Sequence, residues 1–214
     1  MKNLKTLFTL LIAVLCYSCT GSTGGEGDKT GTETPKETPS GETQKGDYTR
    51  LYAMGNECKI TTEEVANLFD VDASKITTRV FPANRSADVR CEYRLALGDN
   101  TVVFKVSAFR STMDQVTKSF KEWTDPTYVF YDYVSRSASG DQLIEKHVNQ
   151  ERLFVLNPNY ENELFIEYGI DFSARYKEKL NASEAQKAKW SAEEERIKQI
   201  AYKAIDFLEE KYRD

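Results

Sequence analysis

The sequence predicts an α+β domain, in which three helices pack on an antiparallel, meandering sheet of about five to seven strands behind a disordered N-terminal tether. Two segments with alternating apolar and polar residues, 89–97 and 102–108, are typical of half-buried antiparallel strands. Three amphipathic segments preceded by capping residues predict the helices. At 40% hydrophobic residues, a domain of about 165 residues buries roughly 70% of its chain surface, so we expect one domain over 48–214.

Residues 1–18 have the layout of an export signal. Lys2 and Lys5 give a positive start, an apolar run covers residues 7–15, and the small Ser18 precedes Cys19. The apolar run is shorter than the about 20 residues that a membrane-spanning helix needs, and polar residues follow it. The sequence therefore predicts that residues 1–18 are removed as a signal peptide.

This segment resembles the bacterial lipoprotein signal, in which a peptidase cuts before a cysteine that is diacylated on its sulfur. Ser18 and Cys19 match that motif, whereas Cys16 stands where the family prefers leucine and Tyr17 is also unusual. The resemblance implies lipidation at Cys19 and a membrane as partner through this anchor, so we expect a location in the cell envelope. In these lipoproteins an aspartate after the cysteine favours retention in the inner membrane. Thr20 stands at that position here, so we expect the outer membrane. The alternative is an ordinary cleaved signal that releases a free protein.

Residues 19–47 are predicted to form a lipidated, disordered linker. From Thr20 to Asp47 there is no aliphatic or aromatic side chain, and glycine, threonine, proline and charged residues cannot offset the entropy cost of ordering. As a flexible coil of 28 residues, the segment would hold its ends roughly 30 Å apart. The alternative is that its repeated Thr-Pro pairs form a recognition or glycosylation segment.

Capping residues and apolar stripes locate the helices. The expected spans are 62–69, 113–123 and 192–212. Their N-caps are expected to be Thr61, Thr112 and Ser191, and a glutamate three residues after Thr61 and after Ser191 completes a capping-box sequence. Residues 177–189 are highly charged and form either a loop or an extension of the last helix.

Alternation and β-branched or aromatic residues locate the strands. The expected strands are 75–81, 89–97, 102–108, 128–134, 152–156 and 163–168. The folded domain should begin near Tyr48, where apolar residues return after the linker. The predicted core comprises Leu95, Val102, Phe104, Phe120, Phe154, Ile166, Ala201 and Leu208.

The four cysteines predict one disulfide once the lipoprotein signal is assumed. Cys16 leaves with the signal and Cys19 takes the lipid, since a lipid on Cys16 would put Leu15 at the cut, where a small residue is wanted. Cys58 and Cys91 then enter an oxidising compartment together, where such pairs tend to be bridged. The alternative is two buried, reduced cysteines without contact.

The order of motifs in residues 57–208 resembles a group of small secreted bacterial lipoprotein domains of unknown function. These motifs are Cys58-x-x followed by Thr61 or Thr62, Glu-Glu-Val65, Cys91-Glu-Tyr93 and Gly140-Asp141, and then two short strands and an alanine-rich terminal helix. The group has a fold similar to PsbP-like α/β sandwiches, so the resemblance implies a sandwich here and no catalytic residue. The chain departs from the group by the insertion 177–189 and by lacking an alanine after Gly140-Asp141.

Charge and residue types argue against several functions. The chain has 29 basic and 34 acidic residues, and loss of two lysines with the signal leaves 27 against 34, a formal charge of −7. Phosphate binding needs a basic surface, so no nucleic-acid partner is expected. His147 is the only histidine, which argues against a multi-histidine metal site, and there is no Gly-x-Ser-x-Gly motif of a serine hydrolase. Residues 70–74 begin like a calcium-binding loop, but Lys75 stands where that loop needs glycine and Phe81 where it needs glutamate. We therefore expect no catalytic residue, no metal and no cofactor.

Residues 128–134 carry aromatic side chains on both faces of a predicted strand. Tyr131 and Tyr133, with Asp132 beside them, form the candidate binding face, because exposed aromatic side chains bind ligands through their large contact area and polar tips. The alternative is that helices cover one face of this strand and a neighbouring strand shields the other.

The sequence as a whole predicts a membrane-anchored, non-catalytic lipoprotein that acts as a binding or accessory module in the cell envelope. Its expected partner is an envelope protein or a small molecule. The alternative function is a small envelope hydrolase, because two carboxylates suffice for such chemistry and their spacing in the sequence does not reveal them.

Overall fold

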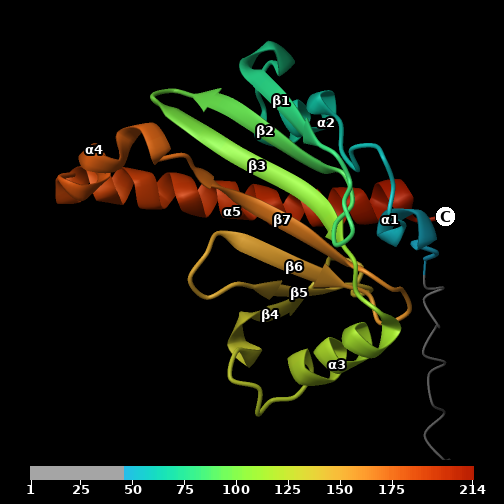
Figure 1. Ribbon diagram of the computed structural model, residues 1–214. Helices are drawn as coiled ribbons and strands as arrows, with labels where there is room; N and C mark the ends of the chain where they lie inside the picture. The colour runs from blue at the N-terminus through green and yellow to red at the C-terminus, as the bar shows by residue number, and fades with distance from the viewer. Residues whose placement is uncertain (1–45) are drawn as a thin grey trace, which may run out of the picture. The chain divides into compact units, whose positions relative to one another are not determined.

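The computed structural model describes residues 46–214 and has the predicted α+β architecture, with one antiparallel sheet of seven strands (Figure 1). The strands are β1 (Ile76–Phe81), β2 (Arg90–Leu97), β3 (Asn100–Phe109), β4 (Val134–Arg136), β5 (Leu143–Lys146), β6 (Arg152–Leu156) and β7 (Glu163–Ile170). The α-helices are α1 (Thr49–Tyr52), α2 (Thr62–Phe69), α3 (Met113–Trp123), α4 (Tyr176–Leu180) and α5 (Glu184–Tyr212). Three of these helices correspond to predicted ones, and α1 and α4 are short additions.

The sheet consists of two meanders joined by a long-range strand pair. Its strand order is β1-β2-β3-β7-β6-β5-β4, so β1 to β3 and β4 to β7 are each sequential. The halves meet where β3 pairs with β7, with Phe104 opposite Tyr168. Helix α3 belongs to the segment that connects the two meanders, leading from the centre of the sheet to its far edge at β4 (Figure 1).

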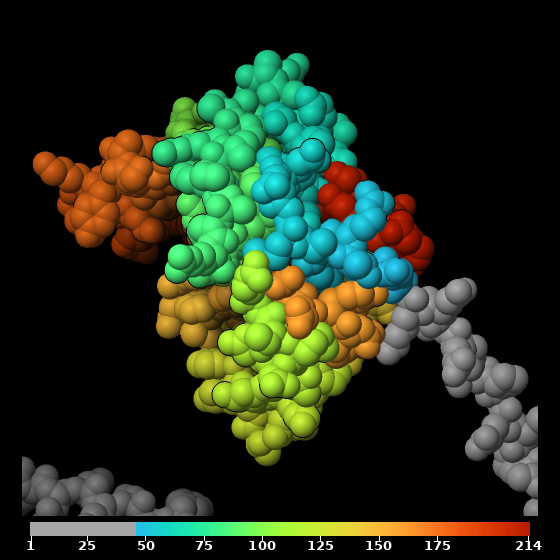
Figure 2. Space-filling model, turned by 45° about the vertical axis from the view of Figure 1, so that its right-hand side comes forward, coloured from blue at the N-terminus to red at the C-terminus, as the bar shows by residue number. Residues whose placement is uncertain are grey.

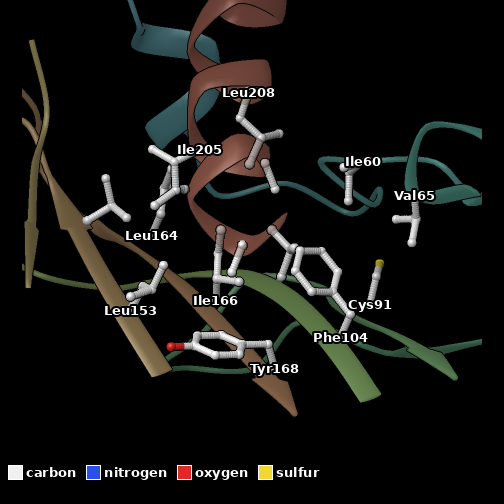
Figure 3. Close-up of a cluster of buried hydrophobic side chains, with 14 of the residues drawn as sticks. Ile60, Val65, Cys91, Phe104, Leu153, Leu164, Ile166, Tyr168, Ile205 and Leu208 are labelled. Carbon is white, nitrogen blue, oxygen red and sulfur yellow. The ribbon is translucent and has the colours of Figure 1, made fainter. Parts of the chain in front are cut away.

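Helices α1, α2 and α5 cover one face of the sheet and form the main core. Helix α5 passes behind the strands in Figure 1, and Figure 3 shows its Ile205 and Leu208 directed at the strand residues. Of the predicted core, six residues are buried here: Leu95, Val102, Phe104, Ile166, Ala201 and Leu208. Phe120 and Phe154 are only partly buried, because they pack in a second cluster on the opposite face.

The opposite face of the sheet is only partly covered. Trp123 of α3 packs there with Leu143 and Leu156, and so shields the β5 and β6 region. In Figure 1 no described helix lies over β1, β2 and β3 on this side. Figure 2 shows the orange segment that contains α4 standing out from the side of the domain. On this face Arg79 is exposed and Arg94 and Lys105 are half-buried, whereas Glu92 and Ser107 are buried between their neighbours.

The predicted N-caps of the first two long helices are confirmed. Thr61 accepts a hydrogen bond from the Glu64 amide at 3.2 Å, and the Glu64 carboxylate accepts one from the Thr61 amide at 2.8 Å. Thr112 caps α3 in the same way with Gln115. The predicted cap at Ser191 is wrong, because α5 begins at Glu184 and its N-cap is Ser183.

Burial of Trp190 against Phe172, with ring centroids 4.9 Å apart, explains this longer helix. Trp190 is 4% exposed, so the turns around it are held against the domain by packing. Residues 177–189 thus contain most of α4, a short connection and the first turns of α5.

The predicted strand at 128–134 is wrong. Tyr128, Tyr131 and Tyr133 donate backbone hydrogen bonds to carbonyls three residues earlier, so the segment is a series of tight turns with a 3-10 helix at Tyr131–Tyr133. Asp125 starts the first turn by accepting a hydrogen bond from the Thr127 amide at 2.8 Å. The edge strand β4 begins only at Val134, and the unpredicted β5 supplies the seventh strand.

Cys58 and Cys91 form the predicted disulfide, with Cα atoms 5.7 Å apart. The bridge connects the segment before α2 to the buried face of β2. Tyr48, the first residue of the predicted domain, is fully buried.

The predicted signal peptide, the predicted lipidation site Cys19 and the predicted linker up to residue 45 lie outside the described residues. Asp47, at the end of the predicted linker, pairs with Asp214 through backbone hydrogen bonds of 3.1 and 3.4 Å. Within residues 46–214, no helix is long and apolar enough to cross a membrane.

We predict a steep loss of stability at alkaline pH, because burial raises the pKa of Tyr52, Tyr93 and Tyr168, and raises that of Tyr48 to about 12. Unfolded tyrosines ionise near pH 10, so this stabilisation is complete below that pH and disappears as the pH rises further. Above pH 10, each such tyrosine should lower the free energy of unfolding by up to about 1.4 kcal/mol per pH unit. Urea unfolding at pH 8 and at pH 11 measures the loss, and Tyr93→Phe should reduce the slope. Parallel pH profiles for that variant and the wild type would contradict the prediction.

Candidate functional site

A row of alternating charges crosses five strands of the uncovered sheet face. The strand register places Glu92 opposite Arg79 and Lys105, and Glu167 opposite Lys105 and Arg152. These residues project away from the main core, because their neighbours along each strand point into it and side chains alternate. The sheet therefore presents positive and negative side chains in turn across this face.

Four of these charges are paired with each other. Lys105 Nζ lies 2.6 Å from Glu167 Oε1 and 3.6 Å from Glu92 Oε2, and Arg152 Nη2 lies 3.2 Å from Glu167 Oε2. Burial alone would raise the pKa of Glu167, but the hydrogen bonds and charges of Lys105 and Arg152 outweigh it and hold this pKa below its usual range. Glu167 is therefore an ionised, fixed acceptor at neutral pH.

Two neighbouring hollows lie beside this row, at the C-terminal end of β7. One has a volume of about 390 Å³ and lies beside Arg94, Lys105 and Asp171. The other has a volume of about 460 Å³ and lies beside Arg152, Glu151, Lys179 and Glu194. Both are lined by the β7 residues 167–170 and by Phe172. We call the two hollows together the β7 groove.

Gly169 lies in the middle of the β7 groove. Its φ of +145° is a backbone conformation that residues with a side chain rarely adopt. A Cβ atom there would lie 3.6 Å from the Cβ of Glu151, which is ordinary contact, so the backbone conformation is what favours glycine. Strand β6 begins at Arg152, opposite Glu167, and the preceding Glu151 still accepts a hydrogen bond of 2.9 Å from the Tyr168 amide.

The first hollow has a rigid polar wall. Arg94 forms ion pairs with Asp171 and with Glu92, the latter at 3.3 Å. Asp171 also accepts a hydrogen bond from the Ser173 amide at 2.8 Å. The contacts with Ser173 and then with Arg94 outweigh burial and lower the pKa of Asp171, so this carboxylate also stays ionised.

The second hollow contains the two acids that remain without a cation. In the described part of the chain, Glu151 and Glu194 form no ion pair within 4.0 Å. Burial raises the pKa of Glu194, the charge of Lys179 opposes this effect, and the charge of Glu151 adds to it. Glu194 thus holds its proton to a higher pH than an exposed glutamate.

Tyr168 also lines the second hollow, but its hydroxyl is buried. Its side chain is 3% exposed, and its hydroxyl forms no hydrogen bond with any described residue. Figure 3 shows the hydroxyl directed away from Phe104, toward the side of Leu153 on β6. Burial first, and then Glu151, raise the pKa of this hydroxyl, so it is a neutral donor.

The predicted binding face at Tyr131, Asp132 and Tyr133 is at a different position. Tyr131 and Tyr133 are 43% and 44% exposed, so solvent reaches both rings. Tyr131 lines a hollow of about 280 Å³ with Trp123 and other residues, and none of these residues also lines the β7 groove. The aromatic turn is therefore a second, separate surface.

His147 lies in the turn after β5, where its Nδ1 accepts a hydrogen bond from the Asn149 amide at 3.1 Å. Within residues 46–214, no group of three or more histidine, cysteine, aspartate or glutamate side chains could hold a metal ion.

Sequence reasoning missed the β7 groove because its residues come from distant segments. The sequence predicts the polar face of β2 with Arg90, Glu92 and Arg94. Which charged side chains lie beside this face depends on the pairing of β3 with β2 and with β7. Glu151 and Glu194 come from a loop and from a helix, and no spacing rule connects them.

A search of family models, of curated proteins and of solved structures found no match to this chain.

Proposed function

We propose that this chain is a membrane-anchored, non-catalytic binding module of the bacterial cell envelope, and that the β7 groove is its binding site. The observation that carries the proposal is the first hollow of this groove, which lies on the open sheet face and whose charged walls are paired in advance. Paired side chains keep their positions without a ligand, so little ordering entropy is lost on binding. The partner is expected to be an envelope protein or a small molecule.

The lowered pKa values of Glu167 and Asp171 support binding over catalysis. A general acid or base works best when its pKa lies near the operating pH, and these carboxylates are shifted away from it. Both are suited to accept hydrogen bonds from a ligand.

The anchor rests on the sequence of the first 19 residues. A lipid on Cys19 would hold the chain in the membrane, and a flexible linker of about 30 Å would let the domain reach a partner beyond the headgroups. The outer membrane is the proposed location.

We expect Cys19→Ala to move the protein from the detergent phase to the aqueous phase, or to leave it uncleaved, in detergent phase separation. Cys16→Ala is the matched control and should remain in the detergent phase, because Cys16 leaves with the signal. Wild-type protein found entirely in the aqueous phase would contradict the anchor.

The groove can be tested by photo-cross-linking in cells that make the protein. A photoreactive phenylalanine analogue at Phe172 lies inside the groove, and the same analogue at Phe109, 36% exposed, lies at the other end of the uncovered face. We expect adducts from position 172 and not from position 109. Absence of adducts at 172, or equal adducts at both positions, would contradict the proposed binding site.

A carboxylate-based hydrolase is the second candidate, and the pair Glu151 and Glu194 favours it. Glu194, whose pKa is raised, would act as the general acid, and Glu151 as the base or nucleophile. Under our proposal, purified protein shows no turnover of envelope polymers. Turnover that Glu151→Gln and Glu194→Gln each abolish, and that the exposed control Glu210→Gln keeps, would replace binding with hydrolysis.

A further inference from the structure

We propose that the ligand of the β7 groove is a neutral, polyhydroxylated chain, which means an uncharged oligosaccharide. This inference rests on the proposed function and specifies the chemistry of its ligand. It follows from the charge balance of the groove, its unused hydrogen-bonding groups and its aromatic wall.

The charges along the groove nearly cancel. The cations are Arg94, Lys105, Arg152 and Lys179. The acids are Glu92, Glu151, Glu167, Asp171 and Glu194. Four positive against five negative side chains give a formal charge of −1, so an anionic ligand meets no net attraction.

A cationic ligand is also a poor match. Three of the five acids already hold a cation of the protein: Glu92, Glu167 and Asp171. Of the other two, Glu194 has a raised pKa, and Lys179 lines the same hollow. A cation in the first hollow would therefore compete with cations of the protein for these acids, and a cation in the second hollow would meet Arg152 and Lys179 there.

The hydroxyl groups of a ligand can use the hydrogen-bonding positions that these ion pairs leave free. A carboxylate has about four acceptor positions and a guanidinium has five N–H donors, so each pair can bind further groups. A sugar hydroxyl donates and accepts at once, and so can bond an acid and a cation of the same pair.

Phe172 supplies an apolar wall common to both hollows. Its ring meets Trp190 edge-on, with an angle of 71° between the planes, and Lys179 Nζ lies 4.3 Å from its centroid. Aromatic rings provide large, rigid contact area for the C–H face of a ligand. Hollows of about 390 and 460 Å³ each lie in the range of small-ligand sites, so the groove suits a short oligomer.

The test is calorimetric titration of the full chain in detergent micelles with cellohexaose, maltohexaose, mannohexaose and xylohexaose. We expect at least one to bind, with a Kd that changes less than about two-fold between about 0.05 and 0.5 M NaCl, because a neutral ligand releases no counterions. Phe172→Leu should weaken binding about ten-fold, and Phe172→Tyr should preserve it, because the ring is retained. Phe109→Leu, outside the groove, should match the wild type.

Sulfated dextran fragments and a chitosan hexamer serve as the anionic and cationic probes. Tighter binding of either one, with a steep salt dependence, would overturn the neutral ligand. The same conclusion follows if no neutral hexaose binds, or if Phe172→Leu leaves its binding unchanged. In each case, cross-linking from position 172 reports separately whether the groove binds a component of the envelope, so the proposed function is judged on its own.

Discussion

Cys58→Ala should lower the free energy of unfolding by about 3 to 4 kcal/mol, because it opens a covalent loop whose ends are 33 residues apart. Cross-linking removes conformations from the unfolded chain, and a loop of this length corresponds to that range on the chain-entropy model. The loss is a large share of the about 5 to 15 kcal/mol that a domain typically has. Urea unfolding without reductant measures it.

Cys58 is the cleaner site for this test, because it is only partly buried, whereas Cys91 is fully buried in the main core. Cys91→Ala should cost somewhat more, since it also removes packed atoms. The double variant should cost no more than Cys91→Ala, because one bond is lost in both. If the double variant lost the sum of the free energies lost by the two single variants, the disulfide would be contradicted. Two free thiols in the purified, non-reduced protein would also contradict it.

Asp88→Ala should lower the free energy of unfolding by about 3 to 5 kcal/mol, because it leaves a buried cation without its anion. Asp88 Oδ2 lies 3.6 Å from Lys59 Nζ, and both side chains are at least 92% buried. Asp88 Oδ1 accepts hydrogen bonds of 2.7 Å from the Gly55 and Val89 amides. Removing this carboxylate therefore also leaves two backbone donors without a partner.

The pH dependence identifies the cause of this loss. Burial lowers the pKa of Lys59, and Asp88 opposes that shift. Without Asp88 the pKa falls further, so the folded variant binds fewer protons than the unfolded chain, and its stability should rise with pH up to about 10. Adding Lys59→Met to Asp88→Ala should recover much of the loss. A loss below about 1 kcal/mol for Asp88→Ala would contradict this account.

Local features of the fold followed from the sequence. Thr61 and Thr112 were identified as N-caps because capping depends on residues only three positions apart. The alternation of apolar and polar residues in β2 and β3 is long enough to predict that Cys91 and Phe104 point into the core. Each of these signals lies within a single element.

Features that depend on tertiary partners did not follow. The aromatic residues at 128–134 fit a series of turns as well as a strand. Only the lack of a neighbouring strand at this segment, within the described residues, distinguishes turns from a strand. Strand β5 has four residues, too few to show a period. The groove residues meet only because β3 pairs with β7, and Trp190 holds the first turns of α5 against Phe172.

Hydrogen–deuterium exchange tests most directly whether the β7 groove is the binding site. The full chain in micelles is compared with and without a soluble extract of the envelope of cells that make the protein. Our account predicts slower amide exchange at residues 169–173 with the extract, and unchanged exchange at residues 128–133. Protection at 128–133, with residues 169–173 unchanged, would contradict it and assign binding to the aromatic turn of Tyr131 and Tyr133.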